Sequence, residues 1–274
     1  MEFMALTLFS VCVQAAIGIM VFAAIGNLKS KDSVFKSAVI TAAGLAIVGL
    51  VSSLVHLGQP LHAANALLRF GSSWLSREIW FTGAFVGVTV VAALLILIKP
   101  TAKGAINALI PIAAVIGLVN VYAMAAIYNS ASVPAWQSSA IFVEFYAAAI
   151  SMGAVLFLAL NKKESSQIRK IVAIGVAIAV VVQVAAMIPY YIDMGASNSL
   201  AAQRSLSILS SMGLALIVKW AFILTGAGLL LFPTKEDEKR VAGVLGAAAL
   251  IFIGQCVGRY LFYAIMIVTQ VGLN

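Results

Sequence analysis

Long apolar segments alternate with short polar ones along the whole chain. Most apolar segments have about the 20 residues that an α-helix needs to cross a bilayer. Their approximate bounds are 4–28, 38–57, 78–98, 105–128, 138–160, 171–192, 210–232 and 241–271. The alternation with period two that marks membrane β-strands is absent. We therefore expect an all-α, polytopic membrane protein with eight transmembrane helices in a bundle.

Composition leads to the same class of protein. Hydrophobic residues make up 63% of the chain and charged residues only 9%, and the mean hydropathy is +1.10. The core of a water-soluble protein does not need so much apolar surface. The apolar segments are rich in Ala and Gly, which let membrane helices pack closely. We expect a single integral membrane domain over residues 1–274 in contact with lipid.

The basic residues alternate between the connections in a regular way. Segments 29–37, 99–104, 161–170 and 233–240 carry twelve Lys and Arg, whereas the other connections carry only Arg69, Arg77 and Arg204. Basic loops stay in the cytoplasm, so both termini are expected outside the cytoplasm. These loops also account for the net charge of +8, which leaves no basic patch for a nucleic acid.

The first apolar segment does not fit a cleavable signal peptide. Glu2 precedes it and no basic residue does, while Lys29 and Lys31 follow it. A signal peptide has the opposite charge order and a shorter apolar stretch. We expect this segment to be a permanent span.

The most informative polar stretch is HLGQPLHAANALLRFGSSWLSRE, from His56 to Glu78. It holds both histidines of the protein, and the charge pattern places it on the outer side of the membrane. Within it, Ser73, Trp74 and Ser76 resemble an aromatic anchor and N-cap region for the third span. His62 follows Pro60 and is interpreted as an interfacial residue.

A second group of candidates lies inside the spans. An ionisable side chain in the bilayer is costly unless it is paired or hydrated, so each one is a functional candidate. The two acids and two bases could form structural pairs that hold the bundle together, and this structural interpretation is favoured for Glu144 and Lys219, without indicating which partner each one takes. For Arg259 the structural and functional interpretations stay open, because Tyr260 and Tyr263 add hydrogen-bonding groups beside it. For Glu78 the functional interpretation is favoured, since His56 lies at the facing helix end.

His56 and Glu78 are suited to proton chemistry. A histidine and a partly desolvated glutamate can take up the two protons of a bound quinol, with Arg77 or a tryptophan orienting its ring. The alternative for His56 is an imidazole that caps carbonyl groups at a helix end.

The sequence offers few residues that could bind a redox-active metal. Cys12 and Cys256 lie alone on separate spans, whereas an iron–sulfur cluster needs four thiolates. A haem would need both His56 and His62, which are close in sequence and separated by a proline. No Walker loop, dinucleotide-binding fingerprint or HExxH motif is present. We expect no haem and no metal in this protein, and any electrons to be held by an organic carrier.

The segment LVHLGQPLHAANALLRFGSSWLSREI resembles the signature region of the membrane anchor subunits of the dimethyl sulfoxide reductase family. In that family a leucine–histidine–leucine–glycine–x–proline stretch closes the second helix, and a turn with a glutamate opens the third. VYAMAAIYNSASVPAW at 121–136 and GQCVGRYLFYAIMI at 254–267 support the resemblance, which covers essentially the whole sequence.

The resemblance implies a role in anaerobic respiration at the bacterial inner membrane. Anchors of this family oxidise menaquinol and pass its electrons to an iron–sulfur subunit with [4Fe–4S] clusters, which feeds a molybdopterin catalytic subunit. The anchor would then not catalyse the terminal reduction by itself. The family's quinol-site histidine and glutamate correspond to His56 and Glu78. The expected quinol-binding set also includes Arg77, Trp74 and Arg259, and Arg77 and Trp74 are local departures at positions where the family varies.

Other classes of membrane protein remain open at this stage. A secondary transporter would show a broken helix at mid-membrane and a matching motif in its other half. Pro111 and Pro189 are the prolines inside spans, and neither lies in a matched glycine-rich break. A purely structural anchor has no need for His56 and Glu78 on one membrane face. An anchor of the polysulfide reductase type differs in sequence signature and orientation.

The topology can be tested directly. A reporter enzyme that works only outside the cytoplasm, fused after Asn274, is expected to be active, because the twelve basic loop residues hold the alternate loops inside. Activity of a cytoplasm-dependent reporter at the same position would reverse the orientation.

Overall fold

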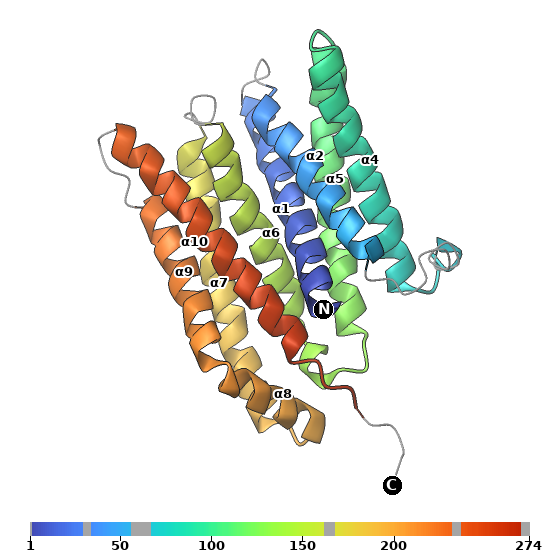
Figure 1. Cartoon of the computed structure of the whole chain (residues 1–274), viewed down its shortest axis with the longest axis vertical. Helices are drawn as coiled ribbons and strands as arrows, with labels where there is room; N and C mark the ends of the chain where they lie inside the picture. The colour runs from blue at the N-terminus through green and yellow to red at the C-terminus, as the bar shows by residue number, and fades with distance from the viewer. Residues whose placement is uncertain (1, 30–33, 56–66, 162–167, 232–236, 270–274) are drawn as a thin grey trace.

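The computed structural model describes residues 2–29, 34–55, 67–161, 168–231 and 237–269. Eight of its helices are long and apolar enough to cross a membrane, which confirms the all-helical, eight-span fold class (Figure 1). They are α1 (Glu2–Lys29), α2 (Lys36–Val55), α4 (Trp74–Ile98), α5 (Lys103–Asn129), α6 (Ala140–Leu160), α7 (Arg169–Ala196), α9 (Gly213–Leu231) and α10 (Asp237–Ala264).

Two short elements lie between these helices. The 3-10 turn η2 (Pro134–Trp136) connects α5 to α6, and α8 (Leu200–Ser211) connects α7 to α9. The spans predicted over 171–192 and 210–232 left residues 193–209 as a connection without a helix of its own. The segment forms a helix because Ser199 caps its first turn, accepting a hydrogen bond from the Ala202 amide. Its apolar and small side chains at 201, 202, 205 and 209 also share one buried face.

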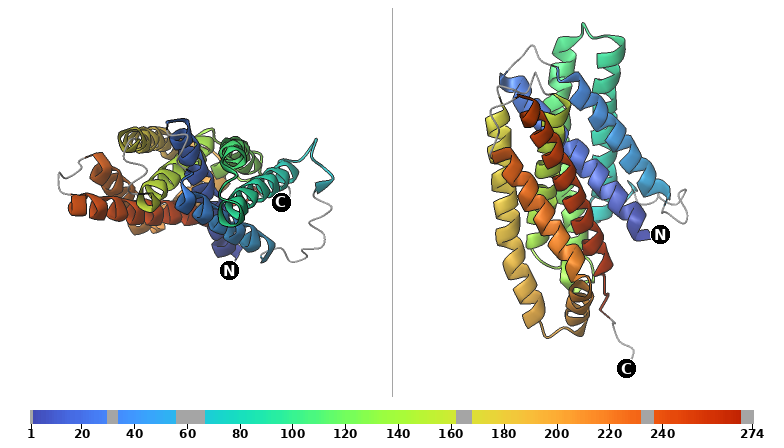
Figure 2. Two further views of the ribbon diagram at one scale, coloured as in Figure 1. Left: turned by 90° about the horizontal axis from the view of Figure 1, so that it is seen from above. Right: turned by 60° about the vertical axis from the view of Figure 1, so that its left-hand side comes forward.

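The spans form two groups of four. In the first group α1, α2, α4 and α5 pack on one another, and in the second α6, α7, α9 and α10 do so. The groups meet along a seam where α1 and α5 contact α6, and α1 also contacts α10. Figure 2 shows the groups side by side with α1 near the middle. The seam brings residues far apart in sequence together.

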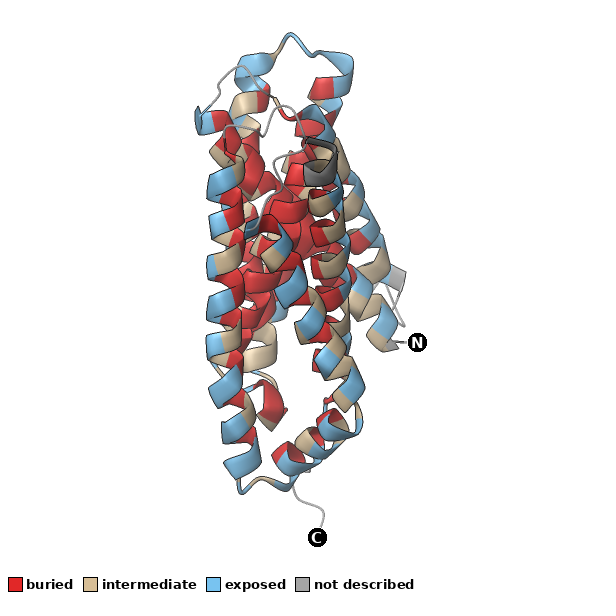
Figure 3. Ribbon diagram, turned by 90° about the vertical axis from the view of Figure 1, so that its left-hand side faces the viewer, coloured by how far each residue is buried: buried red, intermediate tan, exposed pale blue. Residues whose placement is uncertain are grey.

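α1 is the central helix of the bundle. Every residue from 9 to 20 in α1 is buried, whereas the outer helices expose one face each (Figure 3). A helix that is apolar all round needs neighbours on all sides. Polar side chains on this part of α1 therefore face other helices and not lipid.

The crossing of α1 and α6 depends on two glycines. A Cβ on Gly18 would overlap the backbone of Ala149, and a Cβ on Gly153 would overlap the backbone of Gly18. Small residues at such crossings let membrane helices approach at van der Waals distance. The seam is closed at this point by backbone contact.

α5 and α7 continue through their internal prolines. Pro111 lies inside α5 and Pro189 inside α7, and each helix is continuous from end to end. The broken helix expected of a secondary transporter is therefore not found at either proline.

The two ends of the bundle differ in charge. Successive spans run antiparallel, so one end, here called the basic end, carries Lys29, Lys36, Lys99, Lys103, Arg169 and Lys170 (Figure 1). α1 begins and α10 ends toward the opposite end, which also carries Arg69, Arg77 and Arg204. The charge asymmetry read from the sequence thus corresponds to two physical ends of one bundle.

The glycine crossing gives a stability prediction. Gly153→Ala is expected to lower the free energy of unfolding by about 1–3 kcal/mol, because the new methyl group forces α1 and α6 apart. Thermal unfolding of the purified protein in detergent measures the change. Gly87→Ala in α4 is the control, since a Cβ there has no atom within 4 Å. Equal stability of the two variants would contradict the tight crossing.

Candidate functional site

Polar side chains gather where the seam reaches the opposite end of the bundle. They come from four different spans and are called the seam site here: Ser10, Gln14, Glu78, Tyr128, Arg259 and Tyr263. Glu78 lies near the start of α4, and Tyr128 and Tyr263 are the second-last residues of α5 and α10. At roughly 1.5 Å of rise per residue, these three lie in the outermost turns of their helices.

Glu78 is the acid of the seam site. It is only 8% exposed, and among the residues that the structure describes it makes no hydrogen bond or ion pair. Its carboxyl group lies within electrostatic range of the phenols of Tyr128 and Tyr263. A buried carboxyl group without a partner is costly and is usually retained for function.

The two phenols are joined directly. The hydroxyl oxygens of Tyr128 and Tyr263 lie 2.9 Å apart, and either one can donate the hydrogen bond. Ser10 lies beside the Tyr263 hydroxyl. This pair links the first group of helices to the second and supplies groups that both donate and accept hydrogen bonds.

An aromatic wall surrounds the phenols. The rings of Trp136 and Phe262 stack with centroids 5.0 Å apart, and the Trp136 indole N–H donates to the Phe262 carbonyl oxygen at 3.0 Å. Phe145 contacts both Tyr128 and Phe262. All three rings are buried, so the phenols lie in an apolar, aromatic environment.

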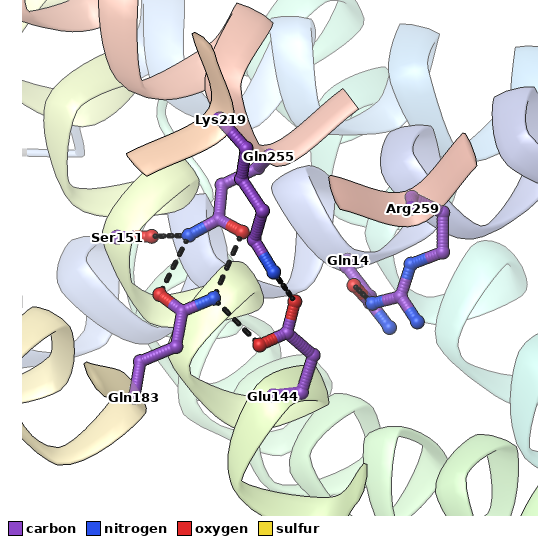
Figure 4. Close-up of polar contacts among 7 residues, drawn as sticks. All are labelled: Gln14, Glu144, Ser151, Gln183, Lys219, Gln255 and Arg259. Atoms are coloured by element: carbon purple, nitrogen blue, oxygen red, sulfur yellow. Dashed lines mark hydrogen bonds and ion pairs between the residues drawn. The ribbon is translucent and has the colours of Figure 1, made fainter. Parts of the chain in front are cut away.

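Arg259 is the cation of the seam site. Its guanidinium group lies 3.6 Å from the ring centroid of Phe145, and its Nη2 donates to Gln14 Oε1 at 2.7 Å (Figure 4). It is 4% exposed and makes no ion pair with any described carboxylate. The Phe145 ring offsets part of the cost of burying this charge through a cation–π contact.

A second polar cluster, the polar clamp, lies inside the second helix group. It consists of Glu144, Ser151, Gln183, Lys219 and Gln255 (Figure 4). Lys219 Nζ lies 2.7 Å from Glu144 Oε1, and Gln183 Nε2 donates to the other carboxylate oxygen at 3.0 Å. Gln183 and Gln255 donate to each other, and Gln255 also donates to Ser151. Glu144 and Lys219, for which a structural role was favoured, thus pair with each other.

Each of the helices α6, α7, α9 and α10 contributes at least one residue to the polar clamp, so the clamp links all four helices of the second group. A Cβ on Gly258 would approach the Lys219 stem within 2.8 Å, so glycine leaves the space in which this stem lies against α10. A cavity of about 20 Å³ adjoins the pair and is also lined by Tyr190, Tyr191 and Phe262. It has room for a water molecule.

Arg77 and Trp74 form a separate pair at the start of α4. The Arg77 guanidinium lies 4.3 Å from the Trp74 ring centroid and donates to the carbonyl oxygens of Phe70 and Gly71. Ser73 caps the helix by accepting a hydrogen bond from the Ser76 amide, as the sequence predicted. Among the predicted binding residues, the structure brings Glu78 and Arg259 to the seam site and leaves Arg77 and Trp74 at its outer surface.

Some predictions fall outside the described residues. His56 and His62 lie in segment 56–66, of which the structure describes nothing. Cys12 and Cys256 are free thiols inside the bundle. In the part of the sequence that is described, no three His, Cys, Asp or Glu residues are grouped as metal ligands.

Sequence reasoning missed Gln14, Ser10 and Tyr128. A signal for the first two was present, because residues four apart lie on one face of a helix. Two polar residues with that spacing in an otherwise apolar span mark a face turned toward other helices. Tyr128 gave no such signal, since its partner Tyr263 is 135 residues away in sequence.

Fold and site together define a polytopic helical membrane protein with a buried ionisable site at one end of its bundle. Residues 1–265 match the family model of DMSO reductase anchor subunits (DmsC), and the protein belongs to that family. The resemblance of its signature segment is therefore confirmed, and the protein is a membrane anchor of the DMSO reductase type.

Three relatives are similar in sequence to this protein over most of their length. The sequence is 28% identical to the C subunit of the anaerobic dimethyl sulfoxide reductase of Haemophilus influenzae, over 95% of this protein and 93% of the relative. It is 26% identical to the YnfH subunit of an anaerobic dimethyl sulfoxide reductase of Escherichia coli K12, with the same coverage. The C subunit from that organism is 26% identical over 80% of this protein and 77% of its own length.

The polar clamp can be tested by a double-mutant cycle. Lys219→Met is expected to destabilise the protein by about 3–5 kcal/mol, because it leaves Glu144 buried without its cation. Adding Glu144→Gln should recover much of that loss, since the remaining groups are neutral. Denaturation in detergent measures each variant. Losses that simply add would show that the two residues do not stabilise the bundle as a pair.

Proposed function

We propose that this anchor oxidises menaquinol at the seam site and passes the electrons to an iron–sulfur partner subunit. That subunit would carry [4Fe–4S] clusters and feed a molybdopterin catalytic subunit in the bacterial inner membrane. Membership of the anchor family supports the setting. The buried carboxyl group of Glu78, which has no partner among the described residues and lies near two phenols, supports the place of the reaction.

Oxidation of a quinol by this protein requires acceptors for two protons and two electrons. Oxidation of a quinol breaks two O–H bonds and releases two protons and two electrons as the ring becomes a quinone. Glu78 accepts one proton and His56 the other, while the electrons leave to the iron–sulfur clusters of the partner. A base must lie within hydrogen-bond reach of the proton that it removes. Glu78 is the proposed base for one hydroxyl, because its buried carboxyl group makes no hydrogen bond among the described residues.

The remaining residues bind and orient the headgroup. Phe145 and Phe262 make the surroundings of the guanidinium group aromatic, and Arg259 offers N–H donors to a ring oxygen. Arg77 and Trp74, stacked on each other at the start of α4, are proposed to guide the quinol at the edge of the site. The polar clamp keeps its own charges paired and stays outside the reaction.

The proposed orientation follows from charge. The basic end lies in the cytoplasm by the positive-inside rule, so the seam site lies near the outer membrane face. Both termini are then outside the cytoplasm. The partner subunit would dock on the outer end, where α8 and residues 67–73 carry exposed side chains.

Substitution of the two proton acceptors tests the reaction. His56→Ala and Glu78→Gln are each expected to lower quinol-dependent reduction by about a hundredfold or more, the range for loss of a general base. Reduction driven by an artificial dye, which reaches the catalytic subunits directly, should stay unchanged. Thr82→Val is the control, because Thr82 lies one turn further along α4 and bonds Asn120 outside the seam site.

The result separates this proposal from a structural anchor. If either variant turns quinol over at the normal rate, that residue is not a proton acceptor. If both do, the protein only tethers its partners or oxidises quinol elsewhere.

A further inference from the structure

Gln14 and Arg259 leave two buried N–H donors without an acceptor. Arg259 Nη2 donates to Gln14 Oε1, but Arg259 Nη1 and Gln14 Nε2 are buried and have no hydrogen-bond partner among the described residues. The two side chains belong to α1 and α10 and lie beside each other in the seam (Figure 4). A buried donor that stays unpaired loses its hydration without compensation.

Charge adds to this imbalance. The one ion pair between described residues is that of Lys219 and Glu144, so Arg259 carries a buried positive charge without a paired anion. Gln14 is fully buried and supplies its only side-chain oxygen to Arg259 already. The two groups without a partner, Arg259 Nη1 and Gln14 Nε2, are therefore both donors. The positive charge of the guanidinium group lies beside them.

These features select the kind of acceptor. A neutral water molecule could accept both hydrogen bonds but would leave the positive charge without an anion. An oxygen that carries negative charge satisfies the donors and the charge together, as in other sites built from preorganised N–H groups. The ring centroids of Phe145 and Phe262 lie 3.6 Å and 5.5 Å from the guanidinium carbon, so the surroundings of the two donors are aromatic, which favours an oxygen borne by an aromatic ring.

We propose that Gln14 and Arg259 form an oxyanion-binding pair for the ionised oxygen of an aromatic hydroxyl ligand. With the proposed function, on which this identification of the ligand rests, that oxygen is the one a quinol exposes after losing a proton. The site then has two unlike ends. Glu78 accepts the proton of one hydroxyl, and the Gln14–Arg259 pair holds the oxygen at the other end after its own proton has left to the second proton acceptor of the proposed reaction.

Two naphthoquinones of nearly equal size test the pair. 2-Hydroxy-1,4-naphthoquinone is an anion at neutral pH, whereas 1,4-naphthoquinone is uncharged. Equilibrium titration of the purified complex, followed by tryptophan fluorescence, gives both dissociation constants. The wild-type complex is expected to bind the anion about tenfold more tightly, as hydrogen bonds to charged groups are the stronger ones. Equal affinities would overturn the proposal without any variant.

Gln14→Glu separates binding from structure. The new carboxylate has the same size and pairs with Arg259, so thermal stability should be kept or increased while the preference for the anion disappears. If the pair were merely structural, the same variant would keep the preference. Gln255→Glu is the matched control. It makes the same change of glutamine to glutamate one helical turn before Arg259 on α10, but in the polar clamp. It should change stability but not the ratio of the two dissociation constants.

The outcomes also separate this inference from the proposed function. Loss of the preference in Gln14→Glu, together with normal quinol turnover in Glu78→Gln and His56→Ala, would leave an anion site in a protein that does not oxidise quinol there. Loss of turnover in those two variants with an unchanged preference in Gln14→Glu would keep the quinol reaction and remove the oxyanion pair.

Discussion

Burial of charge in an apolar medium is the constraint on which the rest of this structure depends. Lys219 and Glu144 meet it by direct pairing, and the amides of Gln183 and Gln255 complete the hydrogen bonds around them. This arrangement stabilises the second helix group. Glu78 and Arg259 meet the same constraint only in part, and they belong to the seam site, where the proposed ligand would complete them. Paired and incompletely paired charges thus separate the residues that hold the bundle from those proposed to act on a ligand.

The sequence predicted the features that depend on local pattern. The length of each apolar segment was enough for the eight spans, because bilayer thickness sets helix length. Loop charges predicted that the basic residues gather at one end. The Ser73 cap and the structural role of Glu144 and Lys219 also followed from residue type and position, whereas the pairing of these two residues with each other came from the structure.

The features that the sequence did not predict depend on packing between distant helices. Arg259 bonds Gln14, 245 residues away, because α10 packs on α1 with the face that carries Arg259. The spacing of residues along the sequence does not predict this contact. The same holds for Tyr128 and Tyr263. Arg77 was grouped with Glu78 because they are neighbours in sequence, yet successive residues on a helix point about 100° apart. Arg77 therefore turns to the carbonyl groups before α4 while Glu78 turns inward.

The contact of Trp136 with Phe262 has a consequence for electron flow. Trp136 is buried in η2, at the end of the bundle opposite the basic end, and its indole ring stacks on Phe262 and contacts the ring of Tyr128 in the seam site. In the proposed reaction, electrons that leave the seam site toward a redox protein docked at this end would cross this aromatic layer. Electron-tunnelling rates fall steeply with distance. The thickness of this aromatic layer would therefore set how fast the two proteins exchange electrons.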